Sequence, residues 1–162
     1  DVPGTVTGAA ADWGTFYAVL RVLPYARRAA RDGSLTPAGL RTVERVCERL
    51  RAGDARLTGP DEPVARLHGD LWSGNVLWTA SGAVLIDPAA HGGHRETDLA
   101  MLALFGLPHL DRVLAAYQEV WPLAPGWQHR VGLHQLHPLL VHAALFGSGY
   151  GAQAASVAAR YG

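Results

Sequence analysis

The chain has 162 residues, the length of about one domain, and its 49% apolar and 17% charged residues are typical of a globular protein. Its formal net charge of zero argues against binding to nucleic acid or to a membrane surface, because both depend on basic residues that neutralise phosphates. The single cysteine, Cys47, excludes an intrachain disulfide, and no apolar run reaches the length of about 18 residues that spans a bilayer. Since the N-terminus also lacks a signal pattern, a cytoplasmic location is expected.

The first predicted element is a helix that ends near Arg31. Residues 1–11 are rich in glycine, threonine and alanine and are expected to form a linker or a frayed start. Asp12 is a suitable N-cap, and apolar residues recur after it at helical spacing. Pro24 lies inside this pattern, so the helix is expected to kink or break near it.

The rest of the chain divides into a helix, a short β segment and further helices. Thr36 and Pro37 are suited to the N-cap and first turn of a helix that ends at Gly53. Residues 64–88 contain short apolar runs separated by glycine, histidine and aspartate, which are typical of short strands. After Pro88 the periodicity is helical again. The sequence predicts further helices over residues 95–105, 108–120, 126–146 and 151–160. The chain is therefore expected to be mainly α-helical with one short β-hairpin segment.

The β segment contains residues suited to phosphoryl transfer. His68, Asp70 and Asn75 have the spacing of the kinase catalytic loop, H-x-D-x-x-x-x-N. Phosphoryl transfer needs a carboxylate that accepts the proton of the attacking hydroxyl, and oxygen ligands that hold Mg²⁺ against the phosphates. Asp70 and Asn75 can supply these two functions.

A hairpin register completes this hypothesis. Strands over residues 76–78 and 84–86 would be joined by a three-residue loop at 80–82, which places Asn75 directly opposite Asp87. A magnesium site is then expected at the open end of the hairpin, and a slip of one residue would turn Asp87 to the other face. Taken singly, each of these polar residues is also a common turn or cap residue.

Three stretches resemble a known family. They are H-G-D-L-W-S-G-N at 68–75, I-D-P-A at 86–89 followed by G-H-R-E-T-D-L-A-M-L-A-L-F-G at 93–106, and L-H-P-L-L-V-H-A-A-L-F-G-S-G-Y at 136–150. These residues are similar to those of the fructosamine (ketosamine) kinases, in the aminoglycoside and choline phosphotransferase branch of the protein-kinase-like fold. The resemblance extends from about Asp12 to Tyr150. It implies that residues 12–162 are the C-terminal lobe of that fold, with ATP and Mg²⁺ as cofactors and a glycated amine as substrate.

The resemblance also implies roles for individual residues. Asp70 would be the general base toward a sugar hydroxyl, and Asn75 and Asp87 would hold Mg²⁺. His68 would brace the catalytic loop. Asp98 would be a buried carboxylate that accepts hydrogen bonds from the backbone of this loop.

Four residues are candidates for substrate binding. Trp72 beside Asp70 offers a flat ring to a sugar or an amino-acid side chain, with core packing as the alternative. His142 and Tyr150 are candidates by the family match, and His94 is a candidate in a charged cluster at a helix start. Arg95 in the same cluster is expected to form a structural ion pair or to contact a phosphate or the substrate.

One short segment departs from the family pattern. His91 and Gly92 stand where fructosamine kinases usually carry aromatic residues. The wall of the site is therefore expected to be smaller and more polar here, which affects the preferred substrate rather than the chemistry.

Three of the histidines in the predicted helix 126–146 are close enough in sequence to consider together. His134, His137 and His142 are three and five residues apart, which raises the possibility of a zinc site. No carboxylate or cysteine joins them in the pattern, and His142 lies off the i, i+4 face. The pattern favours pocket-wall or ordinary helix positions.

Parts of a working kinase are missing from the sequence. All 14 basic residues are arginine, no G-x-G-x-x-G motif is present, and the only methionine is Met101. We expect that the chain lacks the N-terminal lobe of the fold and does not turn over alone. The alternatives are a kinase of an aminoglycoside, choline or another small alcohol, and a non-enzymatic helical interaction domain in which the acidic residues are structural.

Overall fold

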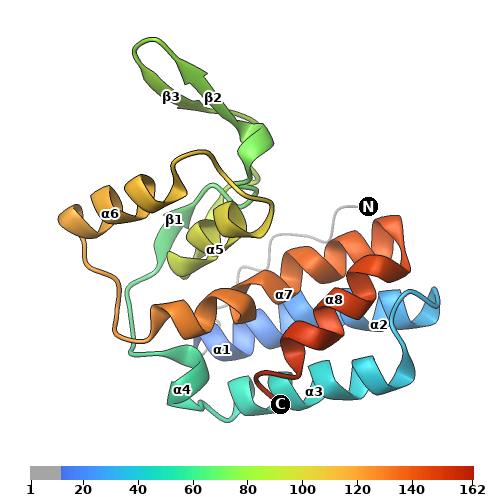
Figure 1. The fold of residues 1–162 in the computed structure, drawn as a ribbon. Helices are drawn as coiled ribbons and strands as arrows, with labels where there is room; N and C mark the ends of the chain where they lie inside the picture. Colours follow the sequence, from blue (N-terminus) through green and yellow to red (C-terminus); the bar gives the residue numbers. More distant parts are fainter. Residues whose placement is uncertain (1–11) are drawn as a thin grey trace.

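The computed structural model describes residues 12–162 of the protein (Figure 1). The predicted linker over residues 1–11 lies outside this described part. Asp12 is the N-cap of the first helix, as predicted, and its side chain accepts a hydrogen bond from the N–H of Thr15 at 2.7 Å. Three segments then follow one another with helical backbone angles at their junctions: α1 (Trp13–Phe16), the π-helical η1 (Tyr17–Val22) and α2 (Leu23–Arg31).

The π-helical segment lies directly before Pro24. The N–H of Leu23 bonds to the carbonyl of Ala18, five residues back, instead of to the usual carbonyl four residues back. A proline has no N–H to donate, and a π-helical turn is one way in which a helix accommodates that gap. The interruption predicted near Pro24 is therefore a local change of helix type, and α2 continues to Arg31.

The second predicted helix is confirmed as α3 (Pro37–Arg51). Its N-cap is Thr36, whose hydroxyl accepts a hydrogen bond from the N–H of Gly39 at 3.0 Å. Gly53, which was predicted to end the helix, has a φ of 70°, a conformation that glycine adopts without strain. A short helix, α4 (Ala55–Thr58), follows.

Two C-terminal helices complete the helical body. Here α7 (Trp127–Phe146) packs against α2 and α8 (Ser148–Ala158) packs against α3, and α7 and α8 also pack against each other (Figure 1). The side chains at the centre of this body are fully buried and mostly aliphatic. They include Val22, Val43, Val46, Leu50, Leu133, Leu136, Leu139 and Leu140.

A buried tyrosine compensates for a proline inside α7. Pro138 has no N–H, so the carbonyl of His134, four residues earlier, loses its helical partner. The hydroxyl of Tyr17 lies 2.9 Å from this carbonyl and 2.9 Å from that of Leu133, and it accepts the N–H of His137 at 3.1 Å. Burial raises the pKa of Tyr17, so the hydroxyl keeps its proton. This network joins η1 to α7.

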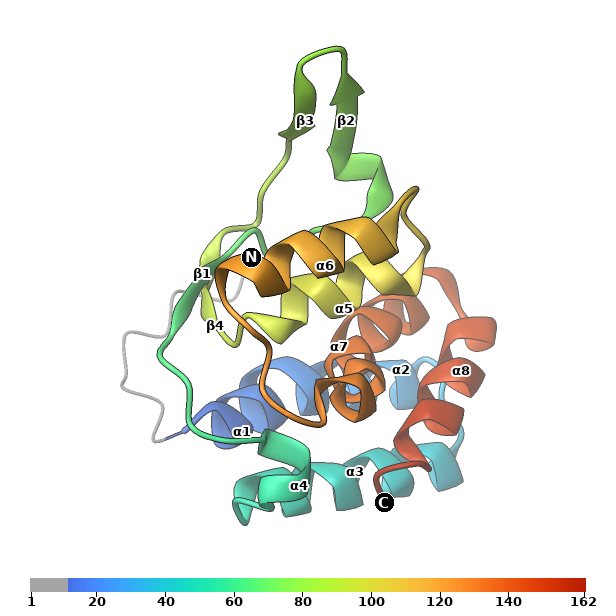
Figure 2. The same cartoon turned by 60° about the vertical axis from the view of Figure 1, so that its left-hand side comes forward.

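The β segment forms two separate antiparallel pairs. The strands β1 (Ala65–Leu67) and β4 (His91–Gly93) pair with each other, and β2 (Val76–Thr79) pairs with β3 (Gly82–Leu85). Figure 2 shows the β2–β3 hairpin projecting away from the other elements. The structure therefore confirms a mainly helical chain with short antiparallel strands, although β4 was not predicted. The two remaining α-helices, both predicted, are α5 (Glu96–Leu104) and α6 (Leu110–Val120).

The predicted hairpin register is wrong by one residue. Val76 pairs with Leu85 instead of with Ile86, and the loop has two residues instead of three. The hydroxyl of Thr79 closes this tighter turn, since it donates to the carbonyl of Gly82 at 2.8 Å. With this register Asn75 lies opposite Ile86, and the N–H of Ile86 bonds to the carbonyl of Asn75 at 3.1 Å. The register therefore does not place Asp87 opposite Asn75.

Within residues 12–162 no helix has both the length and the apolar character that crossing a membrane requires.

Candidate active site

The backbone of the predicted catalytic loop is held by a carboxylate from α5. Asp98 accepts the N–H of His68 at 2.7 Å with one oxygen and the N–H of Gly69 at 3.0 Å with the other. Hydrogen bonds from backbone N–H groups to a carboxylate are charge-assisted and short. The contacts of Asp98 are those that the family resemblance implied for it.

The ring of His68 joins this loop to the end of β3. Its Nδ1 accepts the N–H of Asp70 at 3.3 Å, which leaves Nε2 to donate to the carbonyl of Ile86 at 2.9 Å. Ile86 is thus bound to the loop through both its N–H and its carbonyl. Asp87, the next residue, therefore follows directly from a backbone position that the loop fixes.

A positive φ, rather than strand register, sets the direction of Asp87. Its φ of 51° lies in the left-handed region, which is uncommon for a residue other than glycine and recurs at functional sites. The side chain is exposed, and within residues 12–162 it forms no ion pair and no hydrogen bond. The sequence contained no signal for this turn.

Asp70 and Asn75 are in direct contact. The amide nitrogen of Asn75, which is only 6% exposed, donates to the carboxylate of Asp70 at 3.1 Å and to its carbonyl at 2.9 Å. In the described part of the chain, no hydrogen bond involves the second carboxylate oxygen of Asp70 or the amide oxygen of Asn75. Both oxygens are therefore available to a ligand.

Glycine at position 69 is required by a close backbone approach. Gly69 has a φ of 83°, and a Cβ there would lie 2.1 Å from the carbonyl oxygen of Ala89. The loop and the segment after Asp87 thus touch through their backbones. This contact holds the two parts of the candidate site together.

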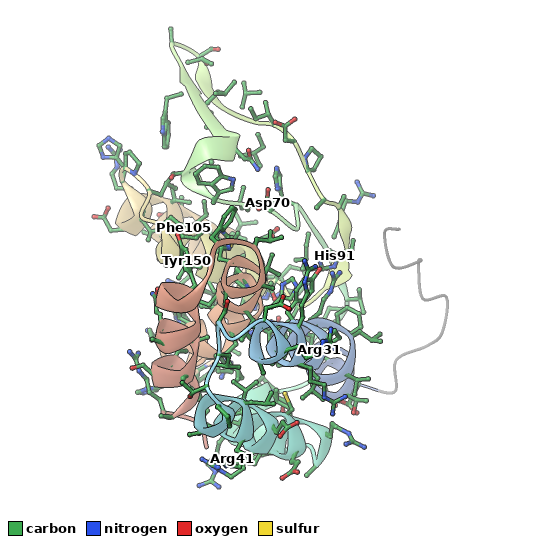
Figure 3. All side chains as sticks on the ribbon, turned by 90° about the vertical axis from the view of Figure 1, so that its right-hand side faces the viewer. Arg31, Arg41, Asp70, His91, Phe105 and Tyr150 are labelled. Atoms are coloured by element: carbon green, nitrogen blue, oxygen red, sulfur yellow. The ribbon has the colours of Figure 1, made fainter. Side chains whose placement is uncertain are left out.

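Aromatic side chains lie beside the catalytic loop. Trp72 and Phe105 meet edge to face with centroids 6.2 Å apart, and the ring of His142 lies 5.1 Å from both Phe105 and Tyr150. Phe146 lies 5.4 Å from His142, and in the view of Figure 3 Phe105 and Tyr150 lie on the same side of Asp70. We call these five residues the aromatic cluster. It brings together three predicted substrate contacts with two phenylalanines that lie in the stretches resembling the family but were not predicted to contact substrate.

His94, the fourth predicted substrate contact, does not belong to this cluster. It is 7% exposed, and its ring packs 5.0 Å from the rings of Trp13 and His134. Burial, together with the neighbouring His134, lowers the pKa of His94 to about 4, so the ring is neutral at pH 7.

Arg95 forms a structural ion pair, the first of its two predicted roles. Its guanidinium binds both oxygens of Glu62 at 2.6 and 2.8 Å and also donates to the carbonyls of Trp121 and Pro122. Glu62 lies 33 residues earlier in the chain, in a loop where the sequence pattern did not indicate it. With its donors occupied by these partners, Arg95 fixes the loops around α5.

A second buried ion pair lies beneath the site. Arg130 binds both oxygens of Glu96 at 2.9 and 2.6 Å, and Nε2 of His134 lies 3.4 Å from the same carboxylate. Potential ligand atoms of His94, Glu96 and His134 lie within 4.8 Å of one another, close enough for a metal ion. However, the guanidinium already neutralises the carboxylate, so the cluster is a satisfied ion pair and not a vacant cation site.

The three histidines considered for a zinc site, which all lie in α7, have different surroundings. His134 bonds Thr97 at 2.9 Å, His137 packs on Tyr25, and His142 lies in the aromatic cluster. This separation agrees with the interpretation of the three as wall and helix residues.

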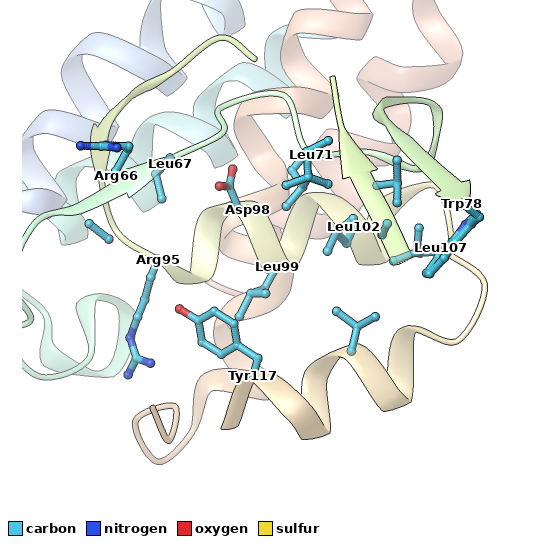
Figure 4. A pocket seen from close by; sticks show the side chains of 15 residues that line it. Arg66, Leu67, Leu71, Trp78, Arg95, Asp98, Leu99, Leu102, Leu107 and Tyr117 are labelled. Carbon is cyan, nitrogen blue, oxygen red and sulfur yellow. The ribbon is translucent and has the colours of Figure 1, made fainter. Parts of the chain in front are cut away.

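An apolar cavity lies next to the catalytic loop, where Leu71 is part of its wall. It has a volume of about 330 Å³ and lies between the β2–β3 hairpin, α5 and α6, where Trp78, Leu99 and Tyr117 line it (Figure 4). Two of its charged wall residues, Arg95 and Asp98, are already bound to Glu62 and to the catalytic loop. The third, Arg66, forms no ion pair within residues 12–162. The groups suited to chemistry are therefore on the loop itself rather than in this cavity.

The buried histidines predict that stability falls in mild acid. Burial lowers the pKa of His94 to about 4 and that of His137 to about 3, whereas an unfolded histidine titrates near 6.5. The unfolded state therefore binds more protons below pH 6.5, and stability that is complete above this pH is lost as the pH falls toward the folded-state values. From pH 7.5 to 5.5 we expect the free energy of unfolding in urea to decrease by about 1 kcal/mol for each buried histidine. Replacing the exposed His109 by glutamine should leave this decrease unchanged, and a flat profile would contradict the prediction.

Comparison with known proteins places the chain in a family. The sequence pattern of the fructosamine kinases matches residues 6–161, which is nearly the whole chain. The chain belongs to the fructosamine kinase family. A crystal structure of a "putative fructosamine-3-kinase" from Thermobifida fusca is 61% identical, with a TM-score of 0.87 over 93% of this chain and 51% of that one.

Curated relatives of the fructosamine kinase family agree with this assignment. The mouse protein named ketosamine-3-kinase is 44% identical over 86 residues, which are 53% of this chain and 28% of the mouse protein. A "probable ketoamine kinase" from Enterococcus faecium is 49% identical over 54% of this chain and 31% of the relative, and one from Klebsiella aerogenes is 36% identical over 83% and 44%. The chain thus spans less than half the length of these curated relatives.

Proposed function

We propose that this chain is the C-terminal lobe of an ATP-dependent kinase that phosphorylates a sugar hydroxyl of ketosamines. The observation that carries the proposal is the contact between Asp70 and Asn75 on a loop whose backbone Asp98 and His68 hold. Relatives named ketosamine-3-kinase and ketoamine kinase support the choice of acceptor. The use of ATP supports a cytoplasmic location.

Asp70 is the general base of the proposed reaction. One of its oxygens accepts the amide N–H of Asn75 at 3.1 Å, which fixes the carboxylate and leaves the other oxygen free for the hydroxyl of the acceptor. A positioned carboxylate that accepts a proton as the bond to phosphorus forms contributes about 10²–10⁴-fold to such a reaction. The bond from Asn75 keeps this carboxylate in one orientation.

The residues around Asp70 fit Mg²⁺. The amide oxygen of Asn75 and the carboxylate of Asp87 are hard oxygen donors, and no described residue bonds to either. We assign these two side chains as the magnesium ligands. The ion would neutralise charge on the phosphates of ATP.

The aromatic cluster is the proposed wall for the acceptor. Trp72 is 39% exposed and Phe105 is 37% exposed, so both rings present a free apolar surface beside Asp70. Flat rings of this kind bind the apolar face of a sugar or the carbon chain of an amine.

The nucleotide needs residues that this chain does not contain. A kinase of this kind uses a glycine-rich loop and a lysine against the phosphates, and this sequence has neither. We propose that an N-terminal lobe in the longer protein supplies both. The chain alone should therefore show no turnover.

An acceptor screen on the full-length protein tests this function. With ATP and Mg²⁺ we expect phosphorylation of fructosyl-lysine, and no reaction with choline or kanamycin under the same conditions. Asp87→Ala should abolish the reaction and magnesium binding together. Turnover of choline or kanamycin alone would overturn the ketosamine assignment, and inactivity toward all three acceptors would favour a non-enzymatic domain.

A further inference from the structure

A small recess lies against the catalytic loop, on the side away from the aromatic cluster. It has a volume of about 30 Å³ and is lined by Gly69 of the loop, by residues of α1 and η1, and by four basic side chains. In Figure 3, Asp70 lies between Tyr150 and Phe105 on one side and His91 on the other. The four basic side chains are Arg21, His91, His94 and His137.

The recess carries positive charge with no acidic neighbour. The guanidinium of Arg21 lies over the ring of Phe16 at 5.5 Å, and within residues 12–162 no carboxylate lies within 4.0 Å of it. No aspartate or glutamate lines the recess. Arg21 is therefore a half-buried cation whose hydrogen-bond donors have no anionic partner among the described residues.

An unpartnered ring nitrogen is a second, independent observation. Nε2 of His137 is buried and forms no hydrogen bond within the described chain. A buried polar atom without a partner is costly, and such atoms often mark the place of a ligand or a water. Burial, Arg21 and His91 together lower the pKa of His137 to about 3, so its ring is neutral and the fixed positive charge of the recess comes from Arg21.

We propose that this recess binds the carboxylate of an acceptor that is a glycated amino acid, with Arg21 as the residue that determines this specificity. The inference rests on the proposed function, since it assigns the part of the acceptor that lies beyond the reacting sugar. A recess of about 30 Å³ holds roughly one water-sized group, which suits the end of a carboxylate better than a phosphate. It also adjoins Gly69, whereas the proposed magnesium ligands are Asn75 and Asp87.

His91 is also placed to bind the carboxylate of the acceptor. It is one of the two positions at which the chain departs from the family pattern, and its Cδ2 lies 3.1 Å from the Cβ position of Gly69, which places the ring against the loop. Nδ1 of His91 lies 2.9 Å from the carbonyl of Gly92, so Nε2 is the ring nitrogen left for an anion, to which it donates when the ring is doubly protonated. The departure found in the sequence and the basic recess therefore occur at the same place.

A pair of acceptors that differ only in the carboxylate tests the proposal on the full-length protein. Fructosyl-glycine carries this group, and 1-deoxy-1-(methylamino)-fructose is the same molecule without it. We expect kcat/KM to be about tenfold higher for fructosyl-glycine, and Arg21→Gln to remove this preference. Arg31→Gln is the matched control, because Arg31 is an exposed arginine at the end of α2.

Binding measured without ATP separates failure of this proposal from failure of the proposed function. Fructosyl-glycine should shift the ring-nitrogen resonances of His91 and His137 in the wild type but not in Arg21→Gln, whether or not turnover follows. Equal binding of the two acceptors, or equal behaviour of Arg21→Gln and Arg31→Gln, would overturn the proposal. A changed KM for ATP in Arg21→Gln with the acceptor preference intact would assign the recess to the nucleotide and overturn it as well.

Discussion

Replacing Asp70 by asparagine in the full-length protein is expected to lower kcat by about 10²–10⁴-fold. The amide is nearly the same size and can keep a hydrogen bond with Asn75, whose nitrogen lies 3.1 Å from the carboxylate. It cannot accept the proton of the acceptor hydroxyl. KM for ATP should change little, because the proposed magnesium ligands remain in place.

The control for this prediction is an aspartate away from the loop. Asp111 is exposed at the start of α6, so Asp111→Asn should retain wild-type kinetics. Steady-state rates with fructosyl-lysine give the comparison. A variant at Asp70 with normal kcat and a raised KM would show that this carboxylate binds substrate without acting as the base.

Removing Arg130 is expected to destabilise the fold by about 3–5 kcal/mol. Arg130→Met leaves the carboxylate of Glu96, which is 3% exposed, without the guanidinium that binds both of its oxygens. Burial by itself raises the pKa of Glu96, but His134 and Arg130 together lower it to about 2, so the group is ionised in the fold. An ionised and uncompensated carboxylate in this position is costly.

Two variants control this stability measurement. Arg27→Met removes an exposed pair in which nitrogen and oxygen are 3.9 Å apart, and it should change the free energy of unfolding by about 0–1 kcal/mol. The double variant Arg130→Met, Glu96→Gln should recover part of the loss, because it removes the buried charge as well. Equal losses in the free energy of unfolding for Arg27→Met and Arg130→Met would show that the buried pair contributes no more to stability than the exposed pair does.

The local parts of the fold could be predicted from the sequence. Thr36, Pro37 and Gly53 mark the ends of α3 because capping depends on residues within one turn of the helix terminus. The catalytic loop could also be predicted, because His68, Asp70 and Asn75 all lie within one short segment and their spacing is visible in the sequence.

The parts that depend on distant partners could not be predicted. The strand β4, whose residues are His91, Gly92 and Gly93, has little strand character and exists because β1 lies beside it. The hairpin register failed because the hydroxyl of Thr79 favours a two-residue loop over the three-residue loop that Gly82 suggested.

The candidate site shows the same division between local and distant contacts. Asp98 was assigned through family resemblance, and its bonds to the loop are present. By contrast, Glu62 as the partner of Arg95 and Phe105 as the neighbour of His142 are contacts across the fold, whereas Phe146 contacts His142 from one turn further along α7. No motif or periodicity in the sequence marks the contacts across the fold.

The most direct measurement is a crystal structure of the full-length protein with Mg²⁺ and a non-hydrolysable ATP analogue. We predict one ion bound by the amide oxygen of Asn75 and the carboxylate of Asp87 at about 2.0–2.1 Å, with Asp70 facing the terminal phosphate. An ion bound without Asn75 and Asp87, or a terminal phosphate out of reach of Asp70, would contradict the account.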